Sequence, residues 1–179
     1  MFFAIAAQMN YRIYGGDAKD TYAHSPPPHN PTVVSIDDAY AKWYEAKYPG
    51  KNLNRLHVLP VKHALQGHPE SGKLWETHIS KILARLDAKL TSTTHDKSIY
   101  RGIVDGTPIF LLRQVDDFAS AAPSEDIAKK VYDSIGVELR LPGESTIPFK
   151  YLGMVGDFNG VDIGQFNDSI VVSCKKYID

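Results

Sequence analysis

Two adjacent carboxylates interrupt an apolar stretch in the second half of the chain. Asp116 and Asp117 follow the apolar run 109–112 and precede a second extended run, 118–122. Two carboxylates at a bend between buried strands repel each other and lose hydration, and a divalent cation such as Mg²⁺ removes both penalties. The alternative interpretation is an acidic hairpin turn, because Asp is common in turns, although Asp-Asp is not a favoured two-residue turn.

A second acidic segment lies near the start of the chain, where Asp17 and Asp20 precede Tyr22. A metal site needs more oxygen ligands than one loop provides, so the two acidic segments are expected to meet. Two carboxylate loops suit phosphoryl chemistry with two metal ions, in which cations activate the attacking oxygen and stabilise the leaving oxygen.

Four motifs in this order resemble those of reverse transcriptases, and the match is most similar to the copia-type retrotransposon polymerases. It covers essentially the whole chain, including the closing segment 173–178. The motifs are Asp17 with Tyr22, then Ala64-Leu65-Gln66-Gly67 with Ser71 and a helix containing Trp75, then Val115-Asp116-Asp117, and finally Phe149-Lys150-Tyr151-Leu152-Gly153.

The resemblance implies a role for each matching residue. Asp17, Asp116 and Asp117 are expected to be the catalytic aspartates and to bind two Mg²⁺ ions, for which Mn²⁺ can substitute. The expected nucleotide-binding residues are Ala18, which adds a carbonyl ligand, Tyr22, which excludes a ribose 2′-hydroxyl, and Gln66 and Gly67, which pack against nucleotide and template. Leu152 and Gly153 are expected to hold the primer end. Without the motif around it, Tyr22 would be interpreted as a core aromatic residue.

The activity implied by the resemblance is RNA-directed DNA polymerisation. The expected partners are a primed RNA or DNA template, deoxynucleoside triphosphates, and the integrase and RNase H domains of a polyprotein. The expected location is intracellular, in a cytoplasmic particle or the nucleus. The expected fold is α+β, a palm with an antiparallel, ferredoxin-like sheet backed by helices and with partial fingers.

The chain also departs from the family pattern. Gln114 stands where the family usually has an aromatic residue, and Gln66 where it commonly has Tyr. Only 16 residues precede Asp17, where the family has most of its fingers. We therefore expect residues 1–179 to form a single partial domain of a longer polyprotein, or a reading frame begun at an internal methionine. Such a chain is expected to bind metal but to extend a primer only near background.

Other functions remain open at this stage. The first is a non-catalytic remnant of a decayed element that folds or binds nucleic acid, and the second is a two-metal nuclease or phosphatase. A zinc site at the pairs His24/His29 and His63/His68 has little support, because a five-residue spacing does not place two imidazoles on one helix face. Residues 47–101 contain ten Lys or Arg and four acidic residues. This block fits a channel for a polyanion or, more simply, a solvated helix face.

The composition is that of a globular domain, with 43% hydrophobic and 23% charged residues in 179. The single cysteine, Cys174, cannot form an internal disulfide, and the apolar start, 1–7, is too short to span a bilayer. Apolar periodicity predicts helices over 37–48, 71–90 and 124–135, the last ending at Gly136, with a helical stub over 2–11. Strands are predicted at 98–104, 109–115, 118–122 and 170–174. Asp105-Gly106 predicts one hairpin, Asn159-Gly160 predicts another that pairs 151–157 with 161–166, and Gly15-Gly16 a turn into the first acidic strand.

Overall fold

A six-stranded antiparallel sheet forms the centre of this protein, whose computed structural model describes residues 1–51, 53–54 and 56–174. Asp105 and Gly106 both have positive φ, which confirms the tight hairpin predicted between the strands Ile99–Val104 and Thr107–Gln114. In spatial order the strands are β4 (Thr91–Ser92), β5 (Ile99–Val104), β6 (Thr107–Gln114), β7 (Asp117–Ala122), β1 (Arg12–Ala18) and β8 (Phe149–Met154).

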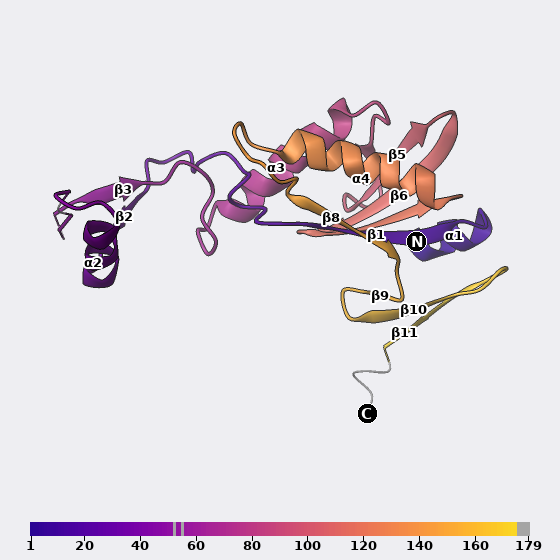
Figure 1. Cartoon of the computed structure of the whole chain (residues 1–179). Coiled ribbons are helices and arrows are strands. Elements are labelled where there is room, and N and C mark those ends of the chain that lie inside the picture. The colour runs from indigo at the N-terminus through magenta and orange to yellow at the C-terminus, as the bar shows by residue number, and fades with distance from the viewer. Residues whose placement is uncertain (52, 55, 175–179) are drawn as a thin grey trace.

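Two helices, α3 (Ser71–Arg85) and α4 (Glu125–Leu139), cover one face of this sheet (Figure 1). The Ser124 side chain accepts a hydrogen bond from the Ile127 N–H and begins α4 as predicted. The chain runs β1–α3–β6–β7–α4–β8, and these four strands lie in the order β8-β1-β7-β6. The main core lies between helices and sheet, and its largest fully buried side chains include Trp75, Tyr132, Phe118, Ile79, Ile82, Leu83, Leu111 and Ile135.

The opposite face of the sheet is covered only in part. Helix α1 (Phe2–Gln8) packs there with a small three-stranded sheet made of β9 (Asp157–Phe158), β10 (Val161–Gln165) and β11 (Ile170–Ser173). This second core contains Phe2, Ala6, Ile13, Ala119, Ala121, Phe158 and Ile163. Within the described residues, none of the helices has the length and apolar character needed to cross a membrane.

Residues 33–60, which we call the arm, project away from this body (Figure 1). The arm contains β2 (Val33–Ser35), α2 (Asp38–Lys47) and β3 (Val58–Pro60), and β2 pairs with β3 in a separate two-stranded sheet. Asp37 caps α2 by accepting a hydrogen bond from the Tyr40 N–H. None of the residues of α2 is buried.

Two predicted helix ends are wrong. Helix α3 ends at Arg85, but Leu90 still reaches the core because the chain turns back and the Leu90 N–H donates to the Leu83 carbonyl at 3.0 Å. Helix α4 continues through Gly136 to Leu139. A Cβ at Gly136 would lie 2.5 Å from the Ile147 side chain, so this glycine permits close packing rather than ending the helix.

Two predicted turns also need correction. The turn at Asn159-Gly160 exists, but it joins only β9 to β10, and β8 pairs instead with β1. Gly15 and Gly16 lie inside β1, where a Cβ at Gly16 would lie 2.5 Å from the Phe149 ring and 2.8 Å from the Tyr132 ring. The absence of a side chain at Gly16 therefore lets the Phe149 and Tyr132 rings pack directly against the backbone of β1.

Candidate functional site

A row of four polar side chains crosses the sheet where β1 ends and β7 begins. In the ladder Gln114 lies opposite Asp117, Asp117 opposite Asp17, and Asp17 opposite Lys150. Residues directly opposite in an antiparallel pair share a face, with Cβ atoms about 5 Å apart. Asp17 therefore has a carboxylate on one side and an ammonium group on the other.

This row lies on the sheet face that the large helices do not cover. Side chains alternate between faces along a strand, and Ala18 and Phe118 belong to the core beneath α3 and α4. Their neighbours Asp17 and Asp117 therefore point to the opposite face. The apolar packing of α1 and the small sheet reaches Ile13 and Ala119 on this face, so the acidic end of β1 borders that packing.

Asp116 lies in the two-residue turn between β6 and β7, whose first residue is strained. Val115 has φ +54°, a conformation that costs a β-branched residue roughly 1–2 kcal/mol. The turn is held from outside, because the buried Trp75 indole N–H donates to the Val115 carbonyl at 2.8 Å. The Ala18 N–H donates to the Asp116 carbonyl at 2.9 Å and so joins the turn to β1.

Burial raises the pKa of the Asp117 carboxyl, and the nearby charges of Asp116, Asp17 and Asp157 raise it further. This is the repulsion that the sequence predicts, and the three aspartates do meet at one end of the sheet. Carboxylate oxygens are the ligands that Mg²⁺ and Mn²⁺ prefer, and a cation would remove the cause of the raised pKa. The donor set thus fits a divalent cation.

The three carboxylates do not enclose an ion in the described geometry. Among residues 1–51, 53–54 and 56–174, no group of three or more His, Cys, Asp or Glu side chains is arranged to hold a metal ion. Binding would require the exposed Asp116 side chain and its half-buried neighbours to adopt other rotamers.

A hollow beside the turn brings together several of the residues expected to bind nucleotide. Tyr22, Gln66 and Asp116 line it, with Asp20, Thr21, Ala23, Ala64 and Leu65. Tyr22 is half-buried and also packs against the main core, as its interpretation as a core aromatic residue predicts. Ala18 is buried and does not line the hollow, but its N–H donates to the carbonyl of Asp116, which does.

Gln66 and Gly67 form the tip of a tight turn. The His68 N–H donates to the Leu65 carbonyl at 3.0 Å, and Gly67 has φ +84°, as the third position of a type II turn requires. The Ser71 hydroxyl donates to the same Leu65 carbonyl at 2.6 Å and fixes the turn to the start of α3. Gln66 is therefore an exposed side chain on a rigid support.

His24 fastens the segment that carries Tyr22 to the loop after α4. Its Nδ1 lies 3.0 Å from the Asp20 carbonyl oxygen, and its Nε2 lies 3.0 Å from the Glu144 carboxylate. Both partners are acceptors, so the ring satisfies both only when each nitrogen carries a hydrogen. The Glu144 pKa is lowered first by the hydrogen bond from the Leu141 N–H and then by His24.

The other histidines considered for zinc make hydrogen bonds to protein groups, and His29 and His68 both contact Glu70. His29 contacts the Glu70 carboxylate, whose pKa is lowered mainly by the hydrogen bond from the His29 N–H. His63 faces the Ser25 carbonyl, and His68 accepts from the Glu70 N–H. His78, on α3, has its pKa lowered by burial and by Arg85.

Leu152 and Gly153, expected at the primer end, form a β-bulge. Gly15 lies opposite Gly153 and Gly16 opposite Tyr151, which leaves Leu152 as the extra residue on β8. Gly153 has φ +76°, and the Leu152 side chain is 47% exposed. The bulge turns an apolar side chain out of the ladder, two residues beyond Lys150.

Sequence reasoning missed three contributors to this site. Lys150 was noted only as part of a motif, and pairing with Asp17 depends on a register that no local pattern reveals. The Trp75 bond to Val115 is a tertiary contact between residues 40 positions apart. Asp157 near Asp117 had no signal beyond its place before a hairpin turn. The closing residues 175–178, which belong to the predicted resemblance, lie outside the described part of the chain.

Comparison with protein-family models, with curated proteins and with solved structures found no match for this chain.

Proposed function

We propose that this chain is the palm of an RNA-directed DNA polymerase of the copia retrotransposon type. The observation that carries the proposal is the meeting of Asp17, Asp116 and Asp117 at the end of one sheet, beside a hollow lined by Tyr22 and Gln66. Residues from three separate motifs of the sequence contribute to this one place.

The connectivity supports the same proposal. The order β1–α3–β6–β7–α4–β8, with the strands arranged β8-β1-β7-β6, is the βαββαβ arrangement of ferredoxin-like folds. A palm of this kind has helices on one face and the reactive carboxylates on the other. Fold alone does not decide function, so the carboxylate site remains the stronger argument.

In the proposed reaction a primer 3′-hydroxyl attacks the α-phosphate of a deoxynucleoside triphosphate and pyrophosphate leaves. Asp17 and Asp116, with Asp117 beside them, would hold two Mg²⁺ ions, which supply charge stabilisation for the attacking and leaving oxygens. Tyr22 packs beneath the sugar and leaves no room for a 2′-hydroxyl. Gln66 contacts the nucleotide from its rigid turn.

The remaining residues position these groups. Leu152 projects from the bulge on β8 to contact the primer end. Lys150, opposite Asp17, supplies a positive charge to the phosphates on the same face. Trp75 holds the backbone of the turn that carries Asp116 in its strained form, so that only side-chain rotamers have to change when the ions bind.

Titration of the folded chain with Mn²⁺, followed by electron paramagnetic resonance of the free ion, tests the metal site. We expect Asp17→Asn and Asp116→Asn each to weaken Mn²⁺ binding by about tenfold or more, since each removes one charged ligand. Asp133→Asn, at an exposed carboxylate on α4, is the matched control and should bind as the unaltered chain does.

A primed RNA template with deoxynucleoside triphosphates then distinguishes the chemistry. Residues 1–179 are expected to extend the primer only near background, so any extension above background that is lost in Asp116→Asn supports the polymerase. Shortening of the primer without any extension would point to a nuclease instead. A folded chain that binds no Mn²⁺, or that loses binding equally in Asp133→Asn, would contradict the proposal and favour a non-catalytic remnant.

A further inference from the structure

Helix α2 carries a stripe of four aromatic side chains that lies outside the site described above. Tyr40, Trp43, Tyr44 and Tyr48 recur at three- and four-residue steps and therefore share one helix face. Adjacent ring centroids lie 5.3 Å apart for Tyr40–Trp43 and 4.8 Å apart for Tyr44–Tyr48. Trp43 is 50% exposed and Tyr48 is 40% exposed, so the stripe is accessible to solvent.

Two lysines lie over these rings. The Lys47 Nζ is 4.8 Å from the Trp43 ring centroid and 5.6 Å from that of Tyr48, and the Lys51 Nζ is 6.0 Å from Tyr48. An apolar face that packs into a protein core does not place two ammonium groups among its rings. Rings with interleaved lysines form the surface that binds stacked bases through the rings and phosphates through the charges.

The acidic residues of α2 lie away from the stripe. Asp38 and Glu45 fall on the opposite side of the helical wheel, where together with Lys42 they line a hollow with Leu53 and Leu56 of the returning chain. One face of the helix is thus occupied by the arm itself, while the face with the rings carries only positive charge. This charge separation complements a polyanion and not a basic or a neutral partner.

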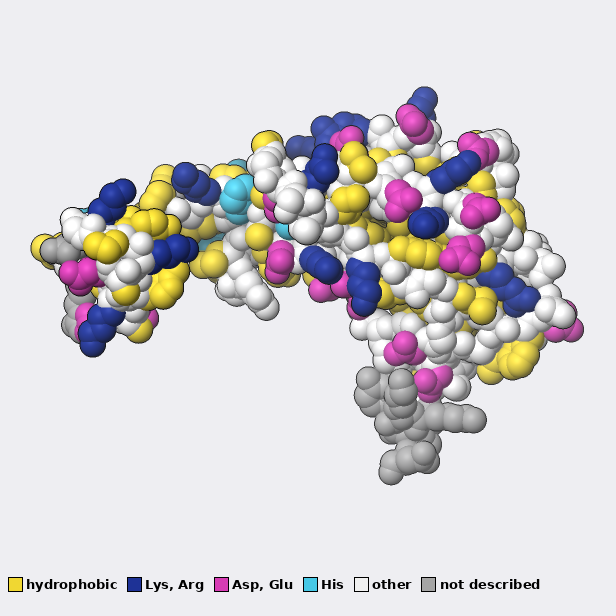
Figure 2. Space-filling model, in the orientation of Figure 1, with side chains coloured by type: hydrophobic (Ala, Val, Ile, Leu, Met, Phe, Trp, Pro, Cys, Tyr) yellow, Lys and Arg dark blue, Asp and Glu magenta, His cyan; other side chains and the backbone are white. Residues whose placement is uncertain are grey.

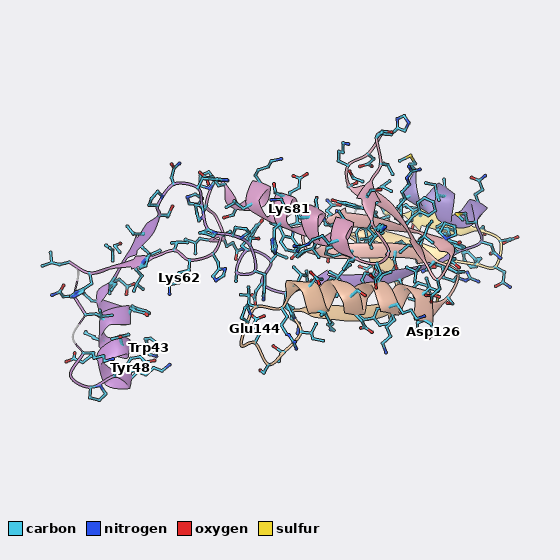
Figure 3. All side chains as sticks on the ribbon, turned by 90° about the horizontal axis from the view of Figure 1, so that it is seen from above. Trp43, Tyr48, Lys62, Lys81, Asp126 and Glu144 are labelled. Carbon is cyan, nitrogen blue, oxygen red and sulfur yellow. The ribbon has the colours of Figure 1, made fainter. Side chains whose placement is uncertain are left out.

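The arm holds this stripe over an open side of the molecule. Figure 2 shows lysine and hydrophobic side chains together on the arm, which bounds a concave side between itself and the body. In Figure 3, Trp43 and Tyr48 lie on the side of α2 that is turned toward the body, and Lys62 lies on the chain that connects the two. A flexible strand that leaves the body on this side would meet the rings.

We infer that the aromatic stripe of α2 is a stacking platform for single-stranded nucleic acid. The choice of nucleic acid as the ligand rests on the proposed function, but the surface itself lies outside all of the polymerase motifs. Stacking is sequence-tolerant because every base has a π face, so the platform binds any unpaired strand.

Fluorescence anisotropy with a 5′-labelled 20-nucleotide oligouridylate, in EDTA, measures this binding directly. We expect Trp43→Ala and Tyr48→Ala each to weaken affinity by about tenfold, the effect of losing one stacked base. Lys47→Gln should lower the slope of log K against log[salt] by about 0.7, whereas the two aromatic variants should leave the slope unchanged. Binding should also quench the exposed Trp43, the chain's second tryptophan being the buried Trp75.

Matched controls use exposed residues on the body. Phe166→Ala removes an aromatic ring that is 57% exposed, and Lys129→Ala removes an exposed lysine on α4. Both should bind the oligouridylate as the unaltered chain does. The double variant Asp17→Asn/Asp116→Asn should also bind normally, so that failure of the polymerase proposal and failure of the platform give different results.

Three results would overturn the inference. Trp43→Ala could bind with unchanged affinity, or Phe166→Ala could weaken binding equally. Alternatively, sedimentation could show that Trp43→Ala dissociates a dimer of the unaltered chain, which would make the stripe a contact between two copies. Far-ultraviolet circular dichroism of each variant confirms that α2 remains helical before these results are compared.

Discussion

At the scale of single residues, the carboxylate site stores electrostatic repulsion that the fold does not relieve. The Asp117 pKa is raised, so the folded chain keeps a proton at a pH where the unfolded chain has lost it. The free energy of unfolding therefore falls as pH rises from the ordinary value of 3.8 through the raised pKa, and it stays lower above it. A divalent cation would restore this free energy of unfolding, because it binds the ionised carboxylates of the folded chain.

This repulsion predicts that Asp117→Asn stabilises the metal-free chain at neutral pH. The expected rise in Tm at pH 7 in EDTA is up to about 4 °C, because solvent screening keeps the contribution of a partly exposed carboxylate to about 1 kcal/mol or less. The gain in Tm should disappear near pH 3, where the Asp117 carboxyl of the unaltered chain is protonated and therefore as neutral as Asn. Calorimetry from pH 3 to 7 checks it, with Asp133→Asn as the control. A lower Tm at pH 7 would show that Asp117 makes a favourable contact in the folded state.

Trp75 acts on the site through the Val115 carbonyl and does not touch the expected substrate. Trp75→Phe keeps an aromatic ring in the core but leaves that carbonyl without its 2.8 Å donor. We expect the free energy of unfolding to fall by about 1–3 kcal/mol and Mn²⁺ affinity to fall with it, because the turn carrying Asp116 loses its support. Urea unfolding and Mn²⁺ titration measure the two effects.

Trp43→Phe is the matched control, since Trp43 is half exposed and far from the turn. It should change neither quantity. If Trp75→Phe lowers stability but leaves Mn²⁺ affinity unchanged, Trp75 supports the core and not the site.

At the scale of elements, hydrogen bonds outside the strands decide how the hollow is shaped. The segment carrying Tyr22 is fastened on one side by His24 to Glu144, and on the other by the Ser25 carbonyl, which accepts from the Ala64 N–H at 3.3 Å. The first contact joins it to the loop before β8, and the second joins it to the segment that carries Gln66. The second contact holds two distant motifs at the hollow, and the bond from the Ala18 N–H to the Asp116 carbonyl holds the third.

The hydrogen bonds that Glu144 makes with the Leu141 N–H and with His24 predict a dependence of Tm on acid pH. The lowered Glu144 pKa means that its contribution is present above the ordinary value of 4.5 and is lost as pH falls below it. Glu144→Gln should therefore have a lower Tm at pH 7 by a few degrees and a flatter decline between pH 5 and 3. Thermal unfolding across this range measures both. Parallel Tm curves for the two proteins would show that the ionised Glu144 carboxylate adds no stability, and Glu138→Gln serves as an exposed control.

Local chemistry made some elements predictable and left others out of reach. Asp105-Gly106 and Asn159-Gly160 form turns because both residues of each pair adopt positive φ, which is a local property. The partner of β8 is not local, since Tyr151 pairs with Gly16 near the start of the chain. Leu90 matched the apolar spacing of the helix although it lies outside α3, because a loop returns its side chain to the same core.

The residues of the site were predictable from the sequence, but their geometry was not. The residue types Asp17, Asp116 and Asp117 suffice to predict a carboxylate cluster, and the structure brings them together. The strain at Val115 and the pairing of Lys150 with Asp17 depend on the register of three strands, which no spacing in the sequence encodes.

At the scale of the whole molecule, the body and the arm are built differently. The body has two cores, one on each face of the six-stranded sheet. The arm has a two-stranded sheet and a helix, α2, with no buried residue. The two ends of the arm meet where it leaves the body, because the Val61 N–H donates to the Thr32 carbonyl at 3.0 Å. The arm thus enters and leaves at one point, and the body does not need it to close its core.

Replacing residues 33–60 by two glycines should therefore leave the body folded. Two residues span the short distance between hydrogen-bonded Thr32 and Val61, as in a tight turn. We expect a Tm within about 3 °C of the full chain, since the apolar burial that stabilises the body is unchanged. The Trp75 indole N–H signal in a ¹⁵N–¹H spectrum should keep its position, and Mn²⁺ binding should persist. Oligouridylate binding should fall as it does in Trp43→Ala. An unfolded product, or a shifted Trp75 signal in a folded one, would show that the arm supports the carboxylate turn.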